Sequence, residues 1–142
     1  MRSTALLLGL ALSLTAVPAV AQDAQPASNL TLAKLVAVRN LRCDALQRGE
    51  QARLAADVHR ASLTGASGVT RINAESQISQ SEAEAGAAFE EAGNLKRRLG
   101  TMLERYVADH RLKWYQTPDE AERVRIEDLI GGAREIVAEE CD

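Results

Sequence analysis

Residues 74–114, AESQISQSEAEAGAAFEEAGNLKRRLGTMLERYVADHRLKW, carry the pattern that decides the fold. Two apolar lines run through this stretch with a seven-residue repeat. The first line consists of Ile78, Ala85, Ala92, Leu99 and Tyr106. The second line, three residues further on, consists of Ala88, Leu95 and Met102. An apolar repeat of this kind predicts one long helix that packs against other helices along its length, as in a coiled coil.

The residues that follow predict a short turn and another helix. Thr117 is the expected N-cap, Pro118 the first helical residue, and Glu120 completes a capping box. Apolar residues then line one face of this helix, and Cys141 falls near the same face. Because the turn is confined to about residues 115–117, the two helices are expected to be antiparallel neighbours.

A further helix is expected before the long one, from about residue 30 to residue 62, with residues 63–73 as a loop that holds two glycines. At 100° per residue, six of its residues fall in one 80° sector, which we expect to be buried. They are Leu32, Val36, Cys43, Leu54, Val58 and Ala61. The first half is apolar on other sides as well. Gly49 leaves open whether this helix is continuous or breaks near its middle.

These elements predict an all-α fold, an antiparallel three-helix bundle with long helices that occupies residues 30–142. The composition agrees, because aromatic residues make up only 3% of a chain rich in Ala, Glu, Arg and Leu. Residues of these types favour long helices with small packing residues over a sheet.

The two cysteines, Cys43 and Cys141, can be tested for pairing by counting levels. At a rise of 1.5 Å per residue, an up-down-up bundle places Cys43 beside about residue 94 of the long helix and Cys141 beside about residue 91. We therefore expect a disulfide that closes a loop of nearly the whole domain, worth at most about 4–5 kcal/mol in chain entropy. Two free thiols, or an intermolecular bond, are the alternatives.

Residues 1–21 have the organisation of a cleavable signal peptide. Arg2 is followed by an apolar run over residues 5–17 and by Ala19-Val20-Ala21 before Gln22. This run is too short to span a bilayer, so no membrane span is expected after cleavage. Residues 22–29 are polar and are expected to form a disordered leader. The predicted location is periplasmic or secreted, an oxidising setting in which a disulfide persists.

Charge is unevenly distributed along the chain. Cleavage removes only Arg2 among the charged residues, which leaves 16 basic against 20 acidic side chains and a net charge of −4. This balance argues against nucleic acid as a partner. Residues 34–71 and 96–113 are mainly basic, whereas residues 119–142 are mainly acidic. Either the basic first helix packs against the acidic third helix, or a charged rim selects a partner.

Gly86, Gly93 and Gly100 recur at seven-residue spacing beside the core line of the long helix. Each costs about 1 kcal/mol relative to alanine in a helix interior. A line of small residues lets another backbone approach closely. Either another helix of the same chain fills this groove, or it receives a partner helix or a second copy, or the spacing is a coincidence.

No motif for catalysis, metal binding or cofactor binding stands out, so we expect a protein that is not an enzyme and carries no cofactor. The two histidines, His59 and His110, are placed roughly 48 Å apart by the same level counting. The leading hypothesis is an exported adaptor or regulator of the bacterial envelope, which binds another envelope protein or itself through helical surfaces. The alternative is a periplasmic carrier or chaperone for an apolar ligand or an unfolded client.

Overall fold

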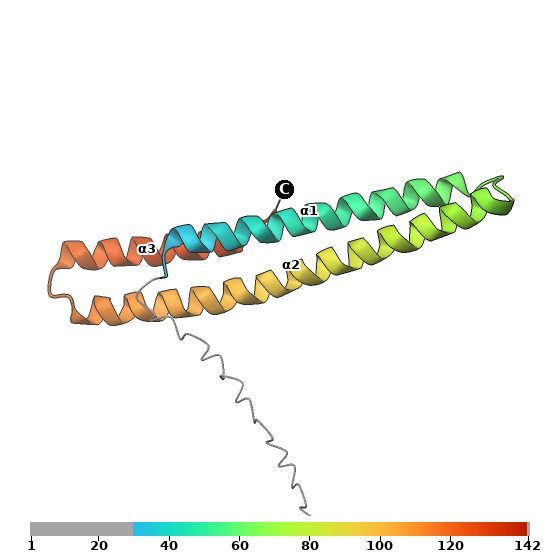
Figure 1. The fold of residues 1–142 in the computed structure, drawn as a ribbon. Helices are drawn as coiled ribbons and strands as arrows, with labels where there is room; N and C mark the ends of the chain where they lie inside the picture. Colours follow the sequence, from blue (N-terminus) through green and yellow to red (C-terminus); the bar gives the residue numbers. More distant parts are fainter. Residues whose placement is uncertain (1–29, 142) are drawn as a thin grey trace, which may run out of the picture.

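The computed structural model describes residues 30–141; the expected signal peptide, the leader at 22–29 and Asp142 lie outside the described residues. Three helices follow one another: α1 (Leu32–Ser62), α2 (Gly68–Gln116) and α3 (Glu120–Ala138). No strand occurs between residues 30 and 141. All three helix pairs are in contact, and neighbours in the sequence run antiparallel (Figure 1). The predicted all-α three-helix bundle is confirmed.

The bundle has three helices at one end and two at the other. α3 is much shorter than α1 and α2, and it returns beside the C-terminal half of α2 and the N-terminal half of α1 (Figure 1). Beyond the end of α3, α1 and α2 continue together as a hairpin. We call residues 46–95 the open hairpin, and the remaining described residues, 30–45 and 96–141, the three-helix end.

The three-helix end contains the large buried side chains. Its core joins residues of all three helices: Leu35, Val38, Leu99, Tyr106 and Ala133. Cys43 and Cys141 are bonded to each other, with their Cα atoms 5.2 Å apart, which confirms the predicted disulfide. The bond holds the segment after α3 against α1. Beside it, Arg39 Nη2 lies 3.1 Å from Glu139 Oε1 and donates to the Glu140 carbonyl oxygen.

The seam between α1 and α2 follows the seven-residue repeat expected for α2. Its buried residues are Ala74, Ser81, Ala85, Ala88, Ala92, Leu99 and Tyr106. The other predicted core residues, Ile78, Leu95 and Met102, are partly buried. α1 runs antiparallel along this line. Arg48 pairs with Glu91, and Arg60, further along α1, pairs with Glu82, further back on α2.

The buried face expected for α1 was largely wrong. Leu54 and Val58 are 60% and 68% exposed, and Val36 and Ala61 are exposed as well. The residues that are buried instead are Leu35, Val38, Ala45, Gly49 and Ala56. In the open hairpin α1 has a single helical neighbour, so only one side is covered, and small residues rather than large ones occupy it.

α1 is continuous through Gly49, which answers the question that the sequence left open. Gly49 is buried under the ring of Phe89 from α2. A Cβ built at this position would lie 2.7 Å from Phe89 Cε1, closer than real Cβ atoms come to other heavy atoms. The glycine therefore allows a large aromatic ring to lie directly on the α1 backbone.

Two predicted helix starts were wrong. The loop is only residues 63–67, because α2 begins at Gly68 rather than near residue 74. Among the described residues, positive φ occurs only at Gly65 and Gly68, so the residues from Val69 onward can continue as helix. α3 is capped by Asp119, which accepts from the Ala121 amide, whereas Thr117 ends α2 and donates its hydroxyl to the Lys113 carbonyl. The cap therefore lies at Asp119, the residue after Pro118, and not at Thr117.

Candidate functional site

The open hairpin is the first candidate for a functional surface, because two long helices stand there without a third. α3 packs against one side of the seam between α1 and α2. We call this side the α3 flank. On α1, this flank carries Arg39 and Cys43, which contact the segment after α3. On α2 it carries Trp114, whose ring lies 4.9 Å from the Arg123 guanidinium of α3.

The glycine line of α2 continues the α3 flank into the open hairpin. Its glycines precede Trp114 by whole multiples of seven residues, so they follow one line along the helix. Gly100 is 14 residues before Trp114, Gly93 is 21 and Gly86 is 28. The disulfide places the end of the α3 segment beside Cys43, and the line runs beyond that level. Gly86 is exposed, and Gly93 and Gly100 are partly exposed.

Within residues 30–141, nothing fills this line. At Gly86, Gly93 and Gly100 alike, no heavy atom from another part of the described chain lies within 4 Å of the position that a Cβ would occupy. The alternative in which another helix of the same chain packs into the groove was therefore wrong. Their use as a groove for a partner stays a prediction.

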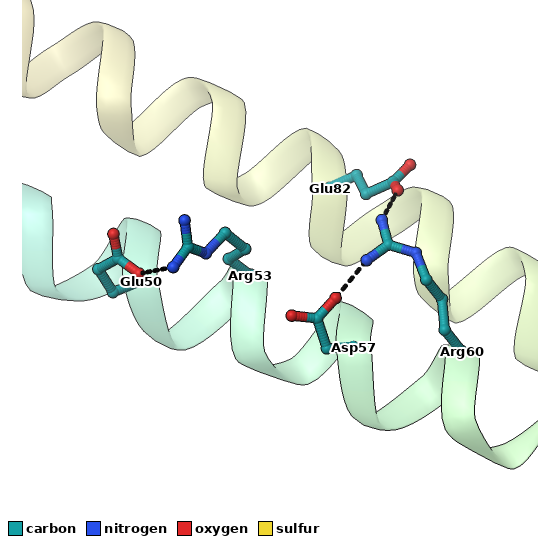
Figure 2. Close-up of polar contacts among 5 residues, drawn as sticks. All are labelled: Glu50, Arg53, Asp57, Arg60 and Glu82. Atoms are coloured by element: carbon teal, nitrogen blue, oxygen red, sulfur yellow. Dashed lines mark hydrogen bonds and ion pairs between the residues drawn. The ribbon is translucent and has the colours of Figure 1, made fainter.

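On the α1 side of the same flank, charged residues pair with one another beyond the end of α3 (Figure 2). Arg53 Nη2 lies 2.9 Å from Glu50 Oε2. Arg60 reaches both Asp57 on its own helix and Glu82 on α2. The hydrogen bond that Arg60 donates to Glu82 is the main cause that raises the pKa of Arg60 above its usual value. This part of the flank is thus polar and internally paired, unlike the glycine line beside it.

The opposite flank of the open hairpin holds a shallow groove of about 470 Å³. Ala52, Ala87 and Ala88 form its apolar part. Its polar residues are Arg48, Gln51, Glu84 and Glu91, and the Arg48–Glu91 ion pair of 2.8 Å crosses it. The groove exists because alanines fill the seam where the three-helix end has larger side chains.

The histidines do not form a site together. His110 stacks on Tyr106, with ring centroids 4.0 Å apart, and its Nδ1 lies 2.9 Å from the Tyr106 carbonyl oxygen. His59 is partly buried in the open hairpin. Between residues 30 and 141, no group of three or more His, Cys, Asp or Glu side chains is arranged to hold a metal ion.

Large apolar side chains are exposed as well, including two that the sequence predicted to be buried. On the open hairpin these are Leu54, Val58, Val69 and Ile72. Ile72 lies on the glycine line, two multiples of seven before Gly86. The three-helix end exposes Leu41 and Leu112. Only the register between the helices, which the sequence does not state, shows which of these residues share a flank.

None of the helices in the described part of the chain is both long and apolar enough to cross a membrane. Comparison with known proteins adds no relative: no family model, no curated protein and no solved structure matches this chain.

Proposed function

We propose that this protein is an exported, non-enzymatic adaptor of the bacterial envelope that binds another protein through its open hairpin. The partner would place a helix along the glycine line, where α3 ends. The observation that supports this most is that Gly86, Gly93 and Gly100 have no neighbour within 4 Å, although they continue the flank on which α3 packs.

The energetics of these glycines favour an external neighbour. Three glycines in a helix interior cost about 3 kcal/mol relative to alanine, and in the free chain no close contact compensates for it. In a complex, the missing side chains would let a partner backbone approach α2 closely. Residues that are unfavourable for their helix and allow no close contact within the fold are most often found at functional surfaces.

Binding fits the described residues better than catalysis or ligand transport. The three raised pKa values belong to Arg60 and Arg71, through exposed ion pairs, and to Tyr106, through burial. They do not converge on one cleft, whereas active sites gather perturbed groups. A carrier site encloses most of its ligand's surface, whereas the groove beside Arg48 and Glu91 is shallow and open to solvent.

The proposal can be tested by placing a photo-crosslinking residue at position 86 or 93 of the tagged full-length chain in its native envelope. Positions 87 and 94 are matched controls, because Ala87 and Asn94 are exposed one residue further along α2 and point toward the other flank. We expect one discrete product from 86 and 93 and much less from 87 and 94.

Two outcomes would contradict the adaptor. The absence of a discrete product at positions 86 and 93 would remove the support for a partner helix on the glycine line. A broad set of products at all four positions would instead favour the chaperone alternative.

A further inference from the structure

A second flank, at the other end of the molecule, has the composition of a docking face. Seven residues before Arg48 on α1 is Leu41, and seven residues after Glu91 on α2 is Arg98. Since Arg48 and Glu91 are paired across the seam, Leu41 and Arg98 lie on the same side of it. One further repeat along α2 reaches Arg105.

This side faces away from α3. At 100° per residue, Arg48 lies half a turn around α1 from Arg39, which contacts the segment after α3. Arg105 lies half a turn around α2 from Trp114, which contacts Arg123 of α3. We call the surface formed by Leu41, Arg98, Met102, Arg105 and Leu112 the basic flank.

The basic flank carries two arginines, Arg98 and Arg105. Arg98 and Arg105 are exposed, and within the described residues neither makes an ion pair or a side-chain hydrogen bond. Asp44 and Asp109, the nearby acidic residues on this side, make no ion pair with either arginine. The flank therefore presents two guanidinium groups with which no carboxylate between residues 30 and 141 pairs.

Apolar side chains lie between these charges. Leu41 and Leu112 are 52% and 59% exposed, and Met102 is partly buried. An apolar strip edged by arginines fits a helix that has an apolar seam and acidic edges. α3 has this design: it buries Ile126, Ile130 and Ala133 and carries mostly acidic residues elsewhere.

We infer that the basic flank binds an acidic amphipathic helix of a partner protein, which would complete a four-helix bundle at the three-helix end. The same flank of a second copy fits poorly, because a twofold contact would set Arg98 and Arg105 against their own copies. Nucleic acid fits less well, since leucine and methionine side chains occupy the middle of the strip. This inference stands apart from the proposed role of the glycine line, which lies on the other flank.

The test uses the oxidised chain from residue 22 to residue 142 and two synthetic helical peptides with the same apolar seam. One peptide has glutamates at the seam edges and the other has lysines. Fluorescence anisotropy at about 50 mM salt should show binding of the glutamate peptide only, and about 500 mM salt should weaken it. Arg98→Glu with Arg105→Glu should lower the affinity at least about tenfold.

Arg97→Glu with Arg111→Glu is the matched control, because it makes the same charge change on the exposed outer ridge of α2. It should change the affinity by less than about threefold. Circular dichroism should show that both double variants keep their helix content. Gly86→Leu with Gly93→Leu should leave peptide binding intact, so this test and the crosslinking test can fail separately.

Three results would overturn the inference. The first is that the glutamate peptide does not bind, and the second is that the two double variants lose affinity equally. The third is that the basic flank binds a different polyanion. Vesicles with anionic lipids, or a single-stranded oligonucleotide, would then bind in a way that depends on Arg98 and Arg105, while the glutamate peptide would not bind.

Discussion

Alanine at the three glycines of α2 should make the free protein more stable. Gly86, Gly93 and Gly100 lie in the helix interior, and a Cβ at each would meet nothing within 4 Å. Each change should therefore raise the free energy of unfolding by about 1 kcal/mol, the helix propensity difference. Because successive positions are about 10 Å apart, the effects should add to about 3 kcal/mol.

Gly49 provides the contrast, because the same substitution there meets the Phe89 ring at 2.7 Å. The gain of about 1 kcal/mol in propensity is opposed by an overpacking cost of about 1–3 kcal/mol. Gly49→Ala should thus leave stability unchanged or lower it by up to about 2 kcal/mol. Adding Phe89→Leu should recover part of the loss, which a double-mutant cycle would measure as coupling.

Urea unfolding of the oxidised mature chain, followed by circular dichroism at 222 nm, measures these differences. With a urea dependence of about 1.5 kcal/mol per molar, the triple alanine variant should unfold at a midpoint about 2 M higher. If Gly86→Ala or Gly93→Ala destabilises the free protein, the glycine line is covered and the argument for a partner there fails. Equal gains at Gly49 and Gly93 would refute the close approach of Phe89.

Three further predictions concern the three-helix end. Replacing both Cys43 and Cys141 with serine should lower the free energy of unfolding by about 2–4 kcal/mol, measured by urea unfolding against the oxidised parent. Burial raises the pKa of Tyr106, so its phenol deprotonates at higher pH in the folded state; stability should be full below pH about 10 and fall as the pH rises further. Tyr106→Phe should weaken that fall, and a profile identical to the parent's would contradict the assignment. Leu99→Ala, at 1% exposure, should cost about 2–5 kcal/mol, whereas Leu54→Ala should stay within about 0.5 kcal/mol; similar losses at the two positions would show that Leu54 is buried in solution.

The seven-residue repeat of α2 was enough to predict the helical class, and level counting was enough to predict the disulfide. Both depend on spacing along regular helices, which the sequence states directly. The buried face of α1 could not be found in the same way, because hydrophobicity favoured Leu54 and Val58. Which face is buried depends on the neighbour, and along the open hairpin Gly49 and Ala56 suit a close approach of α2 better than large residues do.

The candidate surfaces were predicted only in part. The glycine line could be recognised from its spacing, but whether another helix lay against it depended on how the three helices pack, which the sequence does not state. The basic flank was visible in the sequence only as segregated charge. Its assembly from Leu41, Arg98 and Arg105 required the register between α1 and α2, which the pairing of Arg48 with Glu91 supplies.

The uneven distribution of side-chain size along the seam has a consequence for local opening. Near the loop, the contacting residues are close in sequence, but alanine, glycine and serine bury little apolar surface there. At the other end, Leu35 and Tyr106 are far apart in sequence but belong to the strongest part of the core. Backbone amides near residues 56–80 should therefore exchange with solvent through partial unfolding, while those around Leu99 should exchange only when the whole domain unfolds. A protein that binds the open hairpin would slow the hydrogen exchange of the amides near residues 56–80. It would leave the exchange of the amides around Leu99 nearly unchanged.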